Sequence, residues 1–216
     1  AAPRPAESRI AEAGFQNRYY QASGYSGSHV LEHNETGRFE TYVEVAWYQS
    51  VAVDQQDRVW VVDRAYHQVL LMHPSTRYVP FSALYTEYAG GRGQPGHLDG
   101  SRMQARFDNP TGLAVTQDPQ TSLVIFVADT NNHCVRRLDF ATGRTNTIAG
   151  LPGERGLRDG RGQDARLNSP MSLGLDATGV NLFVLDNSRR IRYIDLSNAN
   201  MVTTMADGAC RSVSRW

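Results

Sequence analysis

The chain contains no lysine: all 22 of its basic residues are arginine, and 22 acidic residues balance them. Arginine stays charged, whereas lysine can lose its proton and then serve as a base or a nucleophile. The missing lysine therefore excludes Schiff-base chemistry, a lysine general base and a phosphate loop that depends on lysine. A GC-rich coding sequence accounts for this composition, and selection against a lysine modification such as ubiquitination is the alternative.

Long apolar runs and a cysteine framework are missing as well. No stretch approaches the roughly 18 consecutive apolar residues of a membrane-spanning helix, so the sequence predicts no membrane span. Its two cysteines, Cys134 and Cys210, could form one disulfide, or Cys134 could be a buried free thiol. The tripeptide Asn34-Glu35-Thr36 is a glycosylation acceptor only in a secreted protein. The start at Ala1 fits a secreted or extracellular protein if it reflects signal removal, and an intracellular one otherwise.

The sequence also lacks the patterns that carry catalysis or bind a metal. No serine stands in a G-x-S-x-G elbow. His67 and His133 occupy equivalent positions of a repeat, whereas the remaining histidines share neither a repeat position nor a ligand spacing within a regular element. These are His29, His33, His73 and His97. We therefore predict no catalytic, cofactor-binding or metal-ligating residue.

The sequence does contain a repeat of about sixty residues, which is present in two complete copies. Both copies have an Asp-Gly pair, then an Ala-Arg pair followed by a large apolar residue, then a proline. These positions are Asp99, Arg106, Phe107 and Pro110 in one copy and Asp159, Arg166, Leu167 and Pro170 in the other. Such a repeat predicts one supersecondary unit used several times, each burying its apolar face against the next.

Each unit reads as four short strands separated by turn residues. The second strand of each unit is an apolar run that ends in an aspartate, at Asp63, Asp129 and Asp186. Nearly continuous apolar runs suit strands that are buried on both faces, and four-stranded units in tandem make a β-propeller. The predicted fold class is therefore all-β, with three four-stranded blades at about residues 48–106, 107–166 and 167–208 and no helix longer than about two turns.

The N-terminal segment differs from the rest of the chain. Residues 1–40 show no sustained periodicity and are predicted to form coil or an extended arm, whereas residues 41–216 form the partial propeller. Polar and apolar residues alternate as in a strand with one solvent-exposed face in the sequence Phe39-Glu40-Thr41-Tyr42-Val43-Glu44-Val45. We expect this strand to pair with a blade edge, either in this chain or in a second polypeptide.

The sequence Val127-Ala128-Asp129-Thr130-Asn131-Asn132-His133-Cys134-Val135 resembles the signature of the NHL repeat. The Asp-Gly loop and its lead-in, Ala-Arg-Phe-x-x-Pro-x-Gly-Leu-Ala-Val, resemble the long-loop variety of that family. The resemblance covers roughly residues 41–208; the first copy has Tyr48 in place of the proline, and the third has no histidine. It implies a propeller of about six blades, completed by further blades or a protein partner, in which His67 and His133 are structural.

The repeated polar residues are also predicted to be structural, because a residue that every blade needs is one that stabilises the fold of the blade. Asp63, Asp129 and Asp186 end a strand, where a carboxylate can accept the backbone N–H groups of the following turn. The spacing from Asp99 to Arg106 would let this arginine bind a carboxylate or carbonyl groups of its own loop and pin the crossover to the next blade. Asp159 and Arg166 repeat this spacing.

The function predicted from these features is a non-enzymatic protein–protein interaction module or scaffold, part of an NHL propeller within a larger protein or complex. One alternative is a metal-dependent six-bladed propeller enzyme of the amidating-lyase or lactonase kind. A second is RNA binding through an arginine-rich face, formed by Arg155, Arg158, Arg161, Arg166, Arg189, Arg190 and Arg192. The net charge of zero and the interleaved acidic residues count against nucleic acid, which needs an uncompensated positive excess.

Overall fold

The computed structural model describes residues 19–21, 28–31, 42–45, 48–73, 85–118 and 122–206. Within these ranges the chain forms antiparallel sheets and two short 3-10 turns, η2 (Arg102–Gln104) and η3 (Gly162–Asp164). None of the described residues belongs to a helix long and apolar enough to cross a membrane.

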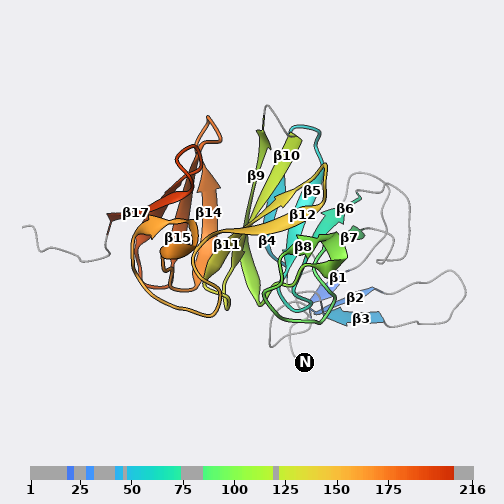
Figure 1. The fold of residues 1–216 in the computed structure, drawn as a ribbon. Helices are drawn as coiled ribbons and strands as arrows, with labels where there is room; N and C mark the ends of the chain where they lie inside the picture. The colour runs from blue at the N-terminus through green and yellow to red at the C-terminus, as the bar shows by residue number, and fades with distance from the viewer. Residues whose placement is uncertain are drawn as a thin grey trace, which may run out of the picture.

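Three of the sheets are the predicted propeller blades (Figure 1). Blade 1 consists of β4 (Tyr48–Val53), β5 (Val59–Asp63), β6 (Gln68–Met72) and β7 (Tyr85–Ala89). Blade 2 contains β9 (Pro110–Asp118), β10 (Ser122–Asp129), β11 (Cys134–Asp139) and β12 (Arg144–Ala149). Blade 3 contains β14 (Pro170–Leu175), β15 (Asn181–Asp186), β16 (Ile191–Asp195) and β17 (Met201–Ala206). The all-β propeller prediction is confirmed.

Blades 2 and 3 each have a fifth, two-residue strand that the sequence did not predict. β8 (Gly100–Ser101) pairs with the outer strand β12, and β13 (Gly160–Arg161) pairs with β17. These strands lie in the lead-in loops, which we define as residues 90–109 for blade 2 and 150–169 for blade 3. Each lead-in loop therefore joins the outer edge of the blade that it enters, ahead of the predicted blade starts at residues 107 and 167.

The core lies between blades rather than within any one of them. Between blades 1 and 2, Trp60 and Val62 pack in one cluster with Ile125 and with Phe107 of the lead-in loop. An equivalent cluster between blades 2 and 3 contains Leu167. Phe107 and Leu167 are both fully buried, so the repeated apolar residue of the lead-in loop fills the space between neighbouring blades.

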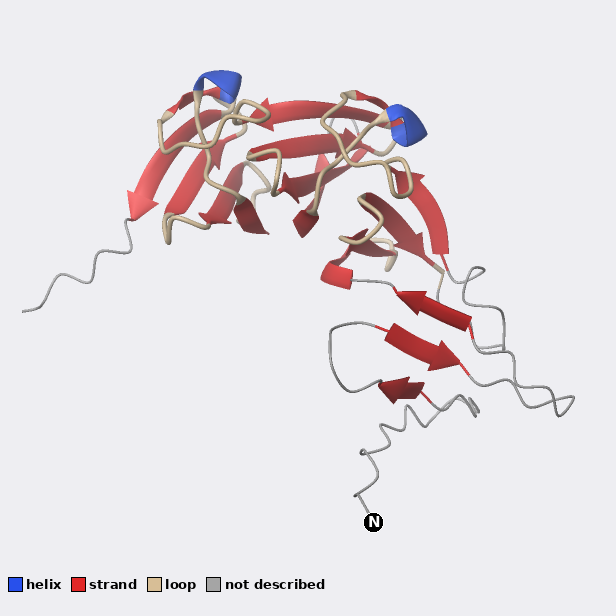
Figure 2. Ribbon diagram, turned by 90° about the horizontal axis from the view of Figure 1, so that it is seen from below, coloured by secondary structure: helices blue, strands red, loops and turns tan. Residues whose placement is uncertain are grey.

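A fourth sheet contains β1 (Tyr19–Gln21), β2 (Ser28–Leu31) and β3 (Tyr42–Val45) in that order. Residues 1–40, predicted to form coil or an extended arm, thus include two short strands, β1 and β2, which are too short to show an alternating pattern in the sequence. Among the described residues β3 pairs with β2 and not with a blade edge of this chain, and its predicted pairing with a second polypeptide stays a prediction. Pairing with the preceding strand closes a shorter loop. Figure 2 shows the sheets following one another along an arc.

Candidate functional site

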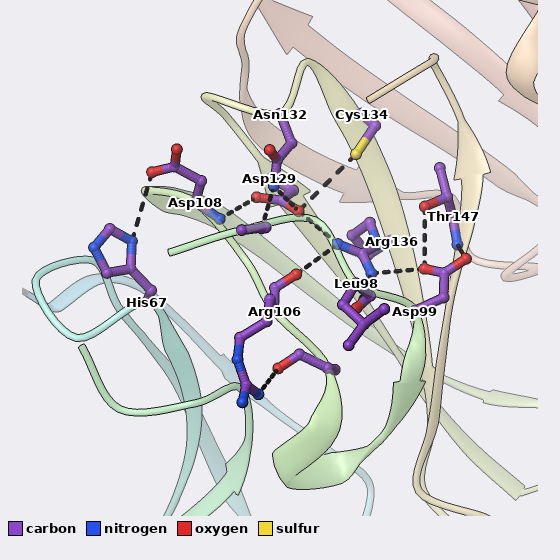
Figure 3. A network of polar contacts seen from close by, with 12 residues as sticks. His67, Leu98, Asp99, Arg106, Asp108, Asp129, Asn132, Cys134, Arg136 and Thr147 are labelled. Atoms are coloured by element: carbon purple, nitrogen blue, oxygen red, sulfur yellow. Dashed lines mark hydrogen bonds and ion pairs between the residues drawn. The ribbon is translucent and has the colours of Figure 1, made fainter. Parts of the chain in front are cut away.

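A network of polar contacts joins the lead-in loop of blade 2 to its strands (Figure 3). At its centre is the fully buried guanidinium group of Arg136, on β11. One of its nitrogens donates to the Asp129 carboxylate at 2.7 Å and to the carbonyl oxygen of Arg106 at 2.9 Å. The other donates to the Leu98 carbonyl oxygen at 2.9 Å and to the Asp99 carboxylate at 2.6 Å. One arginine therefore ties two points of the loop to the end of β10.

The carboxylate of Asp99 completes this attachment at the outer strand. It accepts hydrogen bonds from the backbone N–H and the hydroxyl group of Thr147, each at 3.1 Å. Charge-assisted hydrogen bonds of this kind are about twice as strong as neutral ones. We call Asp99, Arg136 and Thr147 the Asp–Arg clamp of blade 2.

Blade 3 repeats the clamp with Asp159, Arg192 and Thr204. The fully buried Arg192 donates to Asp159 at 2.7 Å and to the carbonyl oxygens of Arg158 and Arg166 at 3.2 and 2.9 Å. Thr204 donates its N–H and its hydroxyl group to Asp159 at 3.0 and 2.9 Å. Hydrogen bonds from Thr204 and Arg192 lower the pKa of Asp159 despite its partial burial, so this carboxylate stays ionised in its clamp.

Arg106 and Arg166, the arginines that the sequence singled out, are not the partners of these aspartates. Arg106 donates to the carbonyl oxygens of Met103 and Ala105 at 2.6 and 2.8 Å. Arg166 likewise binds carbonyl oxygens of its own loop, at Gln163 and Ala165. Both arginines therefore bind loop carbonyls, and Arg166 also pairs with the carboxylate of Glu154 in its own loop at 2.9 Å. The carboxylates of Asp99 and Asp159 bind Arg136 and Arg192 instead.

Arg136 and Arg192 are the important residues that sequence reasoning missed. The available signal was an arginine at the same strand position of two repeats, opposite the buried Val127 and Val184 of the neighbouring strand. The arginine-rich face of the RNA-binding alternative includes Arg192. Its complete burial in the clamp removes it from any such face.

The aspartates at the ends of the second strands cap turns, as predicted, in blades 1 and 3. Asp63 accepts the backbone N–H groups of Ala65 and Tyr66 at 3.0 and 3.1 Å. Asp186 accepts the N–H of Ser188 at 3.0 Å and also its hydroxyl group. Both carboxylates are nearly inaccessible to solvent and satisfy turn donors; Asp186 also accepts the N–H of Asn168 at 3.4 Å and lies 3.7 Å from the guanidinium group of Arg192.

Asp129 differs because its contacts lie outside the following backbone turn. It accepts the N–H of Asp108 at 2.8 Å, the amide of Asn132 at 2.9 Å and the guanidinium of Arg136. Burial raises the pKa of Asp129 to about 6, although Arg136 and these hydrogen bonds act to lower it. The neighbouring Cys134 is a buried free thiol, and burial raises its pKa well above the ordinary value. Cys210 and Asn34 lie outside the described residues.

The repeated histidines connect one blade to the next. His67 and His133 both have a left-handed backbone, with φ of 57° and 55°. Nδ1 of His67 accepts the N–H of Asn109 at 2.9 Å, and Nδ1 of His133 accepts the N–H of Ser169 at 3.2 Å. Each ring must be unprotonated at Nδ1 to accept this bond. Burial, and secondarily Arg155, lowers the pKa of His133 and favours its neutral form.

The two repeated prolines begin the inner strands. Pro110 and Pro170 are buried and lie opposite Asp129 and Asp186 in the ladders. Tyr48 takes this position in blade 1, opposite Asp63. Among the residues that the structure describes, no three His, Cys, Asp or Glu side chains are grouped to hold a metal ion.

These blades, with their repeated clamps, define a segment of a β-propeller. No family model matches the chain. NHL repeat-containing protein 2 from Homo sapiens is 27% identical over 132 residues, which is 60% of this chain and 16% of that protein. The chain thus spans about a sixth of the length of this curated relative. Together with the fold, this similarity confirms the NHL-repeat resemblance over the matched blades.

Solved structures share the propeller fold. An auxiliary nutrient binding protein from Bacteroides ovatus superposes with a TM-score of 0.59 at 18% identity, covering 88% of this chain and 46% of that one. A gluconolactonase from Xanthomonas campestris superposes with a TM-score of 0.52 at 13% identity, covering 88% of this chain and 57% of that one. At such identities the likeness shows the fold alone.

Proposed function

We propose that the chain is part of a larger NHL-type β-propeller that acts as a non-enzymatic interaction module or scaffold. The observation that supports the larger-propeller part of this proposal is the outward face of blade 3, whereas the interaction role rests on the similarity to NHL repeat-containing protein 2. Leu185, Ile191 and Met205 expose 43%, 43% and 59% of their surface there. Clustered exposed apolar side chains of this kind are typical of a surface that another protein unit covers.

The register of the sheets supports a further blade as the unit that covers this face. Ile191 pairs with Leu185 on one side and Ala206 on the other, as Val135 of blade 2 pairs with Ala128 and Ala149. In blade 2 these positions are buried against blade 3.

Blade 3 therefore presents a face like the one that blade 2 buries, which supports a further blade with an apolar residue at the position of Phe107 and Leu167 as its cover. Because each exposed side chain is already about half buried, covering it contributes on the order of 1 kcal/mol.

The test is a charge placed on this face in the full-length protein. Ile191→Asp should lower the melting temperature by several degrees, because the carboxylate would be buried between blades. Leu157→Asp is the matched control, since Leu157 is 41% exposed but lies in a lead-in loop. Equal melting temperatures for the two variants would contradict the proposal.

A metal-dependent propeller enzyme is the competing function, and the propeller fold by itself is compatible with both. Metal analysis of the purified full-length protein separates the two. Stoichiometric zinc or calcium, lost together with stability on chelation, would overturn the non-enzymatic proposal. Binding to RNA that disappears as salt is raised would favour the nucleic-acid alternative.

A further inference from the structure

The turn between the second and third strands of blade 3 carries an arginine where the other two blades have a histidine. Equivalent ladder positions of the third strands hold Leu70, Arg136 and Arg192. Three residues ahead of these stand His67, His133 and Arg189. The backbone of Arg189 is left-handed, with φ of 63°, as it is at both histidines. Arg189 therefore takes the structural position of the repeated histidine.

In blades 1 and 2 this position faces the blade that follows. Nδ1 of His67 accepts the backbone N–H of Asn109, at the end of the lead-in loop of blade 2. Nδ1 of His133 accepts that of Ser169, at the end of the lead-in loop of blade 3. A guanidinium group has only donors, so Arg189 cannot accept such an N–H. A unit that covers blade 3 therefore needs an acceptor where these lead-in loops present a donor.

The charge of this turn favours a carboxylate as that acceptor. Arg189 is exposed, and its guanidinium group makes no hydrogen bond or ion pair with any residue that the structure describes. Arg190 follows it directly, whereas the carboxylate of Asp186 at the start of the turn is buried and accepts the turn's own donors. A neutral surface over these arginines would leave their positive charge without compensation.

The contact between blades 1 and 2 already contains an arginine that reaches the next lead-in loop. Nε of Arg64, in the corresponding turn of blade 1, donates to the side-chain oxygen of Asn109. An aspartate at the position of Asn109 would present that oxygen with a negative charge, and the hydrogen bond would become an ion pair. The register that relates the outward face of blade 3 to the buried face of blade 2 would bring the lead-in loop of a further blade to this turn.

We propose that Arg189 binds a carboxylate of the further blade, carried by the residue that ends its lead-in loop at the position of Asn109 and Ser169. This inference rests on the proposed larger propeller and names the chemistry by which the unit beside blade 3 is recognised. A lead-in loop that presents only a donor there, as in blades 2 and 3, would leave the guanidinium group unpaired. The contact therefore also selects which blade can follow blade 3.

The test uses the absence of lysine from the chain. In the full-length protein with Arg189→Lys, a water-soluble carbodiimide would join the introduced amine to a carboxylate that is in direct contact with it, and peptide mass spectrometry would identify the partner. We expect position 189 to couple to an aspartate or glutamate directly before the first strand of the further blade. Arg144→Lys is the matched control, since Arg144 is also exposed but lies on the outer strand of blade 2. This control should couple to no residue of the further blade.

Melting temperatures of the full-length protein give a second readout. Arg189→Glu should lower the melting temperature more than Arg144→Glu does, and replacing the identified carboxylate with arginine should restore it.

The inference would be overturned if position 189 did not couple, if it coupled only to carboxylates of the described blades, or if the two glutamate variants melted at the same temperature. If Ile191→Asp still lowered the melting temperature in that case, a further blade would cover blade 3 without this contact, and only the inference would fail.

Discussion

Replacing Arg136 with leucine tests whether the clamp holds blade 2 together. The Arg136→Leu variant gives blade 2 the residue that blade 1 has at Leu70. It removes the hydrogen bonds to Asp99, to Asp129 and to two loop carbonyls. It also leaves the carboxylate of Asp129 buried without its cation.

Breaking a buried ion pair by removing one partner costs about 3–5 kcal/mol. For a chain of this size, that corresponds to a fall in melting temperature on the order of 10 °C. Because burial already raises the pKa of Asp129 to about 6, the carboxyl group can escape part of this cost by taking up a proton. The loss of stability should therefore be smaller at pH 5 than at pH 7.5.

Urea unfolding at the two pH values measures both effects, and hydrogen exchange of residues 98–107 shows whether the lead-in loop is released. Arg144→Leu is the control, since Arg144 is exposed on the neighbouring strand. If Arg136→Leu destabilised the protein no more than Arg144→Leu, the clamp would not be the attachment of the loop.

Three further predictions concern packing and protonation. Phe107→Ala should cost roughly 3–5 kcal/mol, because it empties a fully buried position between blades. His133→Ala should cost less, about 0.5–1.5 kcal/mol for each of its two hydrogen-bond contacts to Ser169; thermal melts in the reverse order would refute this. Because the pKa of Asp129 is raised, its contribution to folding stability is fully present below the pKa of the unfolded state and is lost as pH rises through about 6. Asp129→Asn removes this titration, so raising the pH from 4 to 6 should lower the stability of the variant less than that of the wild type in urea titrations. The lowered pKa of His133 has the opposite sign: its contribution is present above the unfolded pKa and is lost as pH falls through the folded pKa, and acid should speed exchange of the Ser169 amide but not in His133→Gln.

The repeat allowed the blades to be predicted because the second strand of each unit is encoded locally, by an apolar run that ends in an aspartate. The turn caps at Asp63 and Asp186 were equally local. The Asp–Arg clamp is not encoded locally, since Asp99 and Arg136 are 37 residues apart in the chain. Sequence spacing favoured Arg106, seven positions away, because nothing in a single sequence reveals which strand lies beneath the loop.

Two other features escaped prediction for physical reasons. From the sequence alone an arginine is expected at the surface. Its guanidinium group is buried only when carboxylates and carbonyls surround it, and the sequence does not show these partners. The sheet of β1, β2 and β3 has strands too short for a hydrophobic period to appear. In both cases the structure depends on the partner: the loop groups that surround each arginine, and the neighbouring strand that pairs with each short strand.

The most direct test of the larger propeller is the accessibility of the outward face of blade 3 in the full-length protein. Cysteine introduced by Ile191→Cys, with Leu157→Cys as the exposed reference, would be labelled with a maleimide and quantified by peptide mass spectrometry. If a further blade covers this face, position 191 reacts much more slowly than position 157 until the protein is unfolded. Equal labelling rates in the folded protein would show that the face is open to solvent and would contradict the account.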